Sequence, residues 1–204
     1  MEHLAKQNRS RERINTILDT ADKILLEHGV EEITVANIAK YSGLKRTSTY
    51  KFFPTPDSLK AMMISRYLDA CLKDVKENSS NISTDQPSII VMRCVEMLYN
   101  FFKNSKGAQI LILSNSLVTP VPSSSLHELS SEIQSIVEVN IKLPEMFNKD
   151  GVFRVFTQII LSILALNTKE SGELNEVGKI EAHRAAHAYL LNWINQSNQG
   201  VSSE

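Results

Sequence analysis

The chain has 204 residues, which is enough for one or two domains with a buried core. Hydrophobic residues make up 42% of it and charged residues 22%, and this ordinary composition excludes a disordered or collagen-like chain. Because 22 Lys and Arg are balanced by 23 Asp and Glu, the net charge is −1, so any basic function must be local.

The first residues, MEHLAKQNRSRERINTI, are polar and lack the apolar core of a signal peptide. The longest apolar stretch, 159–166, is far shorter than the roughly 20 residues of a membrane-spanning helix. Cys71 and Cys94 form no CxxC pair and no disulfide framework. We therefore expect a cytoplasmic protein with no membrane partner.

Apolar periodicity predicts four helices in the first part of the chain. Gly29 and His28 suit the end of the first helix, Thr34 is a suitable N-cap for the second, and Gly43 permits a tight turn before the third. Thr55 and Pro56 have the chemistry of a helix start. The expected ranges are 9–28, 35–41, 45–52 and 55–76.

The polar segment 78–87 predicts a loop, and helical patterns resume after it. Breaks are expected at 119–122, at Pro144 and at 171–172, and no segment alternates like a strand. The later helices are expected at 88–104, 108–117, 124–143, 150–169 and 176–196. The predicted fold is all-α with about nine helices. It consists of an N-terminal helix-turn-helix domain, 1–56, and a C-terminal helical bundle, 57–204. The first helix of the bundle, 57–77, connects the two domains.

Basic residues concentrate in the short-helix, glycine-turn, short-helix unit. Between Ile33 and Pro56 the chain has no acidic residue, and the N-terminal arm adds Lys6, Arg9, Arg11 and Arg13 against Glu2 and Glu12. This is the arrangement that a helix-turn-helix DNA reader requires. Residues near the start of the second short helix would meet base edges, so Arg46 and Thr47 are the candidates for readout, with Lys45 and Ser48 beside them. Tyr50, Lys51 and Thr34 are placed for phosphate oxygens.

The segment from about Ile14 to Leu59 resembles the tetracycline-repressor (TetR) family of bacterial transcription regulators. The similarity includes Ile17, Ala21 and Gly29 and the run TVANIAKYSGLKRTSTYKFFPTPDSL. The resemblance implies a homodimer that binds a palindromic operator in double-stranded DNA and holds a small-molecule effector in its C-terminal domain. Many members have a phosphate-binding lysine where this chain has Pro56, so that contact should be absent or supplied by Lys51 or Lys60.

The C-terminal part predicts a dimer interface and an effector pocket. The helices at 150–169 and 176–196 could pair across a two-fold axis into a four-helix interface, or could be core helices of a monomer. A pocket for a small hydrophobic effector would be lined by aromatic and aliphatic side chains, each of which could equally be core packing. The candidates are Met97, Phe101, Phe102, Leu111, Phe153 and Phe156.

Other classes of function have weaker support. His183 and His187 are four residues apart, but nothing near them completes a metal site, so no metal and no cofactor are expected. The chain has no phosphate loop and no nucleophile elbow, so it is not expected to be an enzyme. The leading prediction is a DNA-binding repressor released by an effector, and the alternative is a helical interaction or scaffold protein that has lost DNA binding.

Overall fold

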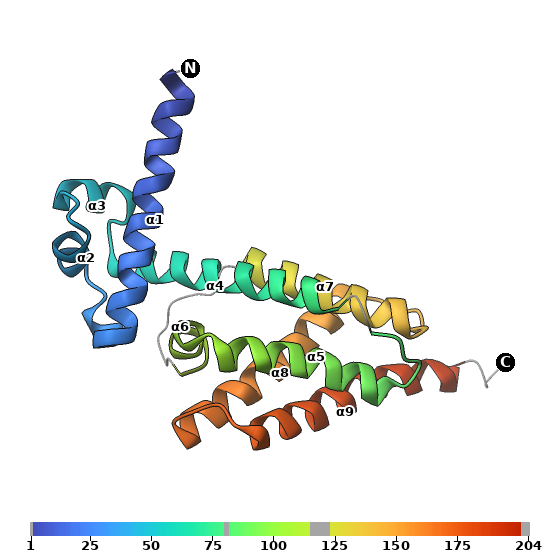
Figure 1. Cartoon of the computed structure of the whole chain (residues 1–204). Helices are drawn as coiled ribbons and strands as arrows, with labels where there is room; N and C mark the ends of the chain where they lie inside the picture. Colours follow the sequence, from blue (N-terminus) through green and yellow to red (C-terminus); the bar gives the residue numbers. More distant parts are fainter. Residues whose placement is uncertain (1, 80–81, 115–122, 201–204) are drawn as a thin grey trace. The chain divides into compact units, whose positions relative to one another are not determined.

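The structure is a computed structural model that describes residues 2–79, 82–114 and 123–200, with side chains described over 7–79, 82–114 and 124–195. Throughout these residues the regular secondary structure is helical (Figure 1), so the all-α prediction is confirmed. The described residues form two compact units, which we call the N-terminal unit, up to Arg66, and the C-terminal unit, from Tyr67. The break predicted at 119–122 lies outside the described residues.

The N-terminal unit is a small bundle in which α1 packs on α2, and α2 packs on α3. Its core consists of fully buried aliphatic side chains such as Ile17, Leu25 and Ile38. The sequence placed the start of α1 at Arg9, but α1 begins at Glu2. Its elements are α1 (Glu2–His28), a short 3₁₀ helix (Val30–Glu32), α2 (Val35–Ser42), α3 (Arg46–Phe52) and the first part of α4 (Pro56–Asn78).

Local hydrogen bonds fix the helix boundaries that the sequence predicted in this unit. The Thr34 hydroxyl accepts a bond from the backbone N–H of Asn37 at 3.1 Å, which confirms the N-cap of α2. Gly43 ends α2 with φ +70°, a left-handed conformation that favours glycine. Thr55 and Ser58 cap α4 reciprocally: the Thr55 hydroxyl accepts from Ser58 N at 3.1 Å, and the Ser58 hydroxyl from Thr55 N at 3.3 Å.

The C-terminal unit is a helical bundle in which α8 is covered by α7 and α9, and α5 packs on α9. Figure 1 shows α8 and α9 running side by side. Phe102, Phe153 and Phe156 are fully buried and are the largest side chains of its core. Its elements are the rest of α4, α5 (Pro87–Asn104), α6 (Lys106–Ala108), a π-helical segment η2 (Gln109–Ser114), α7 (Ser123–Asn140), α8 (Lys149–Ser171) and α9 (Glu176–Gly200).

The prediction of one α-helix over 108–117 is wrong within the described residues. The chain forms only a short α-helical turn, α6, and then the π-helical segment η2. Gly107 lies in this region, where a β-carbon would collide with the ring and hydroxyl of Tyr67 on α4. The Gln109 side chain is buried and donates to the Phe102 carbonyl at 3.4 Å. The close packing of Gly107 on α4 and the bond from Gln109 therefore accompany the π-helical segment, whose turns are wider than those of an α-helix.

A pair of asparagines closes the turn between α8 and α9. Asn167 Nδ2 donates to Asn175 Oδ1, and the backbone N–H of Asn175 donates to Asn167 Oδ1, both at 3.0 Å. Gly172, with φ +75°, ends α8 immediately before this turn. The two long helices are therefore held as a fixed antiparallel pair.

Two further features of the C-terminal unit are the apolar character of α8 and the burial of both cysteines. By length and composition α8 could cross a membrane, but half of its apolar window is buried inside the protein, as in the core helix of a globular domain. Cys71 and Cys94 are both free and buried. Burial raises the pKa of the Cys94 thiol to about 12, and it also raises the pKa of Cys71, with a further contribution from Asp74.

Candidate nucleic-acid interface and ligand cavity

The turn between α2 and α3 presents one face of α3 to solvent. Thr49 is fully buried and Phe53 is nearly so, and these side chains anchor α3 against the unit. The opposite face carries Lys45, Arg46, Thr47, Tyr50 and Lys51, which are exposed, with Ser48 half-buried beside them. The structure therefore brings the predicted residues of this helix onto one accessible surface, which we call the α3 face. Thr34 lies at the start of α2 and is half-buried.

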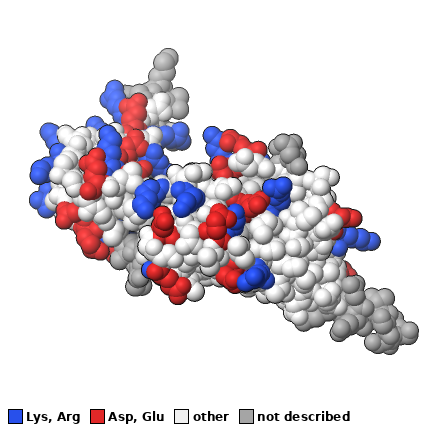
Figure 2. Space-filling model, turned by 60° about the horizontal axis from the view of Figure 1, so that its bottom comes forward, with Lys and Arg blue, Asp and Glu red and all other residues white. Residues whose placement is uncertain are grey.

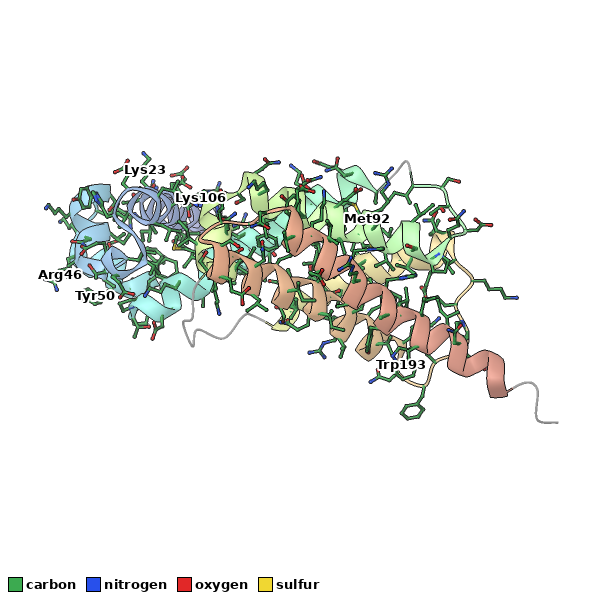
Figure 3. The ribbon with its side chains drawn as sticks, turned by 90° about the horizontal axis from the view of Figure 1, so that it is seen from below. Lys23, Arg46, Tyr50, Met92, Lys106 and Trp193 are labelled. Atoms are coloured by element: carbon green, nitrogen blue, oxygen red, sulfur yellow. The ribbon has the colours of Figure 1, made fainter. Side chains whose placement is uncertain are left out.

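Arg46 and Tyr50 contact each other on the α3 face. The Arg46 guanidinium donates to the Tyr50 hydroxyl at 3.3 Å and lies 5.5 Å from the centre of its ring. Figure 3 shows the two side chains next to each other at the surface of the unit. Sequence reasoning assigned them separate roles and missed the contact, although their spacing of four residues on one helix could have indicated it.

The charge around the α3 face is mainly basic. From Ile33 to Pro56 the chain has no Asp or Glu, and Arg9, Arg11 and Arg13 on α1 are exposed and form no ion pair among the described residues. Figure 2 shows blue side chains at the surface of the N-terminal unit, on the left, together with red ones elsewhere on that unit. Lys60 is only 7% exposed, whereas Lys51 is exposed, so of the two lysines considered for the contact absent at Pro56, Lys51 is the accessible one.

A cavity of about 780 Å³ lies in the C-terminal unit, between the end of α4 and one face of α5. This is within the usual size of small-molecule sites. Of the six residues predicted to line a pocket, Met97 and Phe101 line this cavity, whereas Phe102, Leu111, Phe153 and Phe156 are buried and do not. Its lining residues are Asp74, Asn78, Ile82, Arg93, Glu96, Met97, Asn100, Phe101, Asn104 and Ser105.

The histidines of α9 stack on each other and bond to α5. The rings of His183 and His187 are 5.5 Å apart and 8° from parallel, and His183 Nε2 donates to the Ser88 carbonyl at 3.0 Å. Burial, and secondly the neighbouring His183, lower the pKa of His187 below its usual value. Among the residues whose placement is described, no three His, Cys, Asp or Glu side chains gather as metal ligands.

The sequence and the fold were compared with those of known proteins. No family model matches the chain. An uncharacterised helix-turn-helix-type transcriptional regulator of Mycobacterium bovis is 32% identical over 59 residues, a match that spans 29% of this chain and only 31% of the relative's length.

Solved structures match over nearly the whole chain. A TetR-family transcriptional regulator from Pectobacterium atrosepticum superimposes with a TM-score of 0.71 at 14% identity, covering 92% of this chain and 96% of that one. SmeT, the repressor of a multidrug efflux pump of Stenotrophomonas maltophilia, superimposes with a TM-score of 0.59 at 15% identity, covering 89% of this chain and 90% of that one. The chain therefore has the fold of the TetR-family transcriptional regulators.

Proposed function

We propose that the protein is a bacterial transcriptional repressor that acts in the cytoplasm, binds a palindromic operator as a homodimer and is released by a small-molecule effector. The observation that carries this proposal is the α3 face, which joins a basic, acid-free surface to a helix anchored from behind by Thr49 and Phe53. A helix of this kind fits the major groove of B-DNA. The structural similarity to SmeT, which is a repressor, supports repression over activation as the proposed activity.

Each residue of the α3 face has a chemical role in this proposal. Arg46 and Thr47, in the first turn of α3, would meet base edges, with Lys45 and Ser48 flanking them. Tyr50 and Lys51, further along the helix, would bind phosphate oxygens. Thr34 would contribute to a phosphate contact at the start of α2, where backbone N–H groups are also available.

Homodimerisation would use the outer faces of α8 and α9. Large apolar side chains are exposed there: Val155 is 47% exposed and Leu166 53% on α8, while Val177 is 63% exposed and Ile180 43% on α9. Exposed apolar side chains of this size on neighbouring helices favour a partner surface. A two-fold pairing of α8 and α9 would bury them in a four-helix interface and give each operator half-site its own α3.

Effector release would act through α4, which among the described helices is the one whose residues belong to both units. The dimer would bind its operator only when the two α3 helices are one DNA turn apart. That distance is about 34 Å on B-DNA. A ligand in the C-terminal unit lowers operator affinity if it binds more tightly to a state with another spacing, and the size of the effect is set by the difference between its affinities for the two states. α4 would carry the change, because its end lines the cavity and its start follows α3.

The first experiment is selection of bound sequences from a random double-stranded DNA pool with the purified full chain. Enrichment of a palindrome with half-sites about one helical turn apart would support the proposal and supply the operator. No enriched sequence from folded, dimeric protein would contradict it, and would favour an interaction protein that no longer reads DNA. Ligands that release the selected operator would then test the effector step.

A further inference from the structure

We infer that the cavity between α4 and α5 binds an amphipathic organic cation that carries a protonated amine. This inference deepens the proposed function, since it gives the cavity a ligand class, and it rests on that function only for the step in which ligand binding releases DNA. It differs from the expectation of a hydrophobic effector, because much of the cavity wall is polar.

An unbalanced carboxylate gives the cavity its charge. Of its two acidic residues, Glu96 pairs with Arg93 at 2.9 Å, which compensates both charges. Asp74 is half-buried and forms no ion pair with any residue that the structure describes. The cavity therefore has a net negative charge, and a cationic group beside Asp74 would provide the missing partner.

Asparagine side chains, which carry hydrogen-bond acceptors, line the same cavity as this carboxylate. Asn78 Nδ2 donates to the backbone carbonyl of Asp74 at 2.8 Å, which directs its other amide atom, the Oδ1 acceptor, away from that bond. Asn100 and Asn104 line the cavity from α5 and are both exposed. A protonated amine donates up to three hydrogen bonds, so these oxygens favour it over a quaternary ammonium, which donates none.

The apolar part of the wall suits the body of such a ligand. Phe101 is half-buried, and its ring packs edge-on against the buried Phe102, with centroids 5.3 Å apart and planes at 81°. Met97 lies beside it in the wall and is 7% exposed. An aromatic ring and a polarisable thioether bind apolar groups and also attract a nearby cation.

The test uses four probes that share one aromatic body and differ in the head group: phenylbutylamine, phenylbutanol, phenylbutyrate and phenylbutyl-trimethylammonium. Binding to the full chain is measured by calorimetric titration up to about 10 mM, a range that reaches weak fragment affinities. We expect the amine to bind about tenfold more tightly than the alcohol, and the butyrate to bind most weakly.

Three variants show whether the binding occurs at this site. Asp74→Asn keeps the shape of the side chain and should reduce amine affinity to that of the alcohol. Asp69→Asn, which removes an exposed carboxylate of the same helix outside the cavity, should change nothing. Asn100→Asp, at an exposed position, should tighten amine binding severalfold, and it tests the charge even if Asp74→Asn fails to fold.

The outcomes separate this inference from the proposed function. The inference would be overturned if no probe binds, if the amine and the alcohol bind equally, or if the butyrate binds more tightly than the amine. It would also be overturned if Asp74→Asn and Asn100→Asp leave amine binding unchanged. Amine binding that depends on these residues upholds it, even where the protein selects no operator or keeps its operator when the amine is bound. The last two results would instead count against the proposed function.

Discussion

At the scale of single residues, the contact between Arg46 and Tyr50 would hold the proposed base-contacting side chain in place before DNA binds. The guanidinium lies against the phenol ring, so the long arginine side chain has already lost part of its rotamer freedom before DNA arrives. Arg46 is also the side chain of the α3 face best suited to bidentate recognition of guanine. A base contact and a phosphate contact should respond differently to mutation.

Arg46→Ala should reduce sequence specificity. Loss of one bidentate base contact costs about 1–3 kcal/mol for the cognate operator and much less for unrelated DNA. The measurement is a titration of the variant against the selected operator and against operators changed at one base pair. Equal weakening on all sequences would show that Arg46 binds phosphate instead.

Lys51→Ala should weaken binding to every DNA sequence by a similar factor. A phosphate contact carries no sequence information, and its loss should lower the slope of log K against log salt by about one. Affinities at several salt concentrations measure this slope. Lys73→Ala, at an exposed lysine of α4, is the matched control and should leave the slope unchanged.

His187 should make the protein less stable in mildly acidic solution. Its pKa is lowered in the folded chain, so the unfolded chain takes up a proton first as the pH falls through the ordinary histidine value of about 6.5. The stabilisation is complete above that pH and is lost below it. Urea unfolding at pH 7.5 and pH 5.5 should show a larger loss for the native chain than for His187→Gln, and equal losses would refute this.

At the scale of helices and turns, the sequence was informative wherever an apolar stripe or a cap marked the boundary. Thr34 and Thr55 could be recognised because their hydroxyls cap the first turn of a helix. Gly43 could be recognised because the end of α2 takes a left-handed backbone conformation that favours glycine. The first turns of α1 could not, because their sequence carries no apolar stripe.

Features that arise from packing between distant segments could not be predicted from the sequence. The π-helical segment η2 has an ordinary apolar pattern, and its wider turn accompanies Gly107 packing against Tyr67, forty residues earlier in the chain. Lys60 is buried as well, and nothing in the local sequence distinguishes it from an exposed lysine. The cavity likewise needed the structure, because its wall combines α4 and α5.

Gly43→Ala should destabilise the protein through backbone strain. Open space surrounds the position where a β-carbon would stand, so the cost comes from φ +70° and should be about 1–2 kcal/mol. Gly43→Asn should lose less, since asparagine tolerates this conformation better. Unfolding free energies from urea titration give the order glycine, asparagine, alanine; an alanine variant as stable as the native chain would contradict the argument.

At the scale of the whole molecule, the proposed activity depends on two copies. One α3 reads a single half-site, and a dimer gains affinity because the second half-site is bound at a high effective concentration. The exposed apolar side chains of α8 and α9 make this dimerisation testable independently of DNA.

Ile180→Glu should yield a monomer that binds the operator at least tenfold more weakly, because a buried unpaired carboxylate would oppose the interface. Light scattering coupled to size-exclusion chromatography measures the mass. Val139→Glu is the matched control, because Val139 is 84% exposed on α7, outside the proposed interface. A dimer that survives Ile180→Glu would place the interface elsewhere.

The two buried thiols also make the protein a convenient substrate for site-directed labelling. Because burial raises the pKa of both Cys71 and Cys94, neither presents a reactive thiolate to a maleimide or methanethiosulfonate reagent at neutral pH. A cysteine introduced at the exposed Thr47 would therefore take a spin label selectively, with both native cysteines left in the core. If the protein forms the proposed dimer, dipolar spectroscopy between the two labels would follow the separation of the two α3 helices directly.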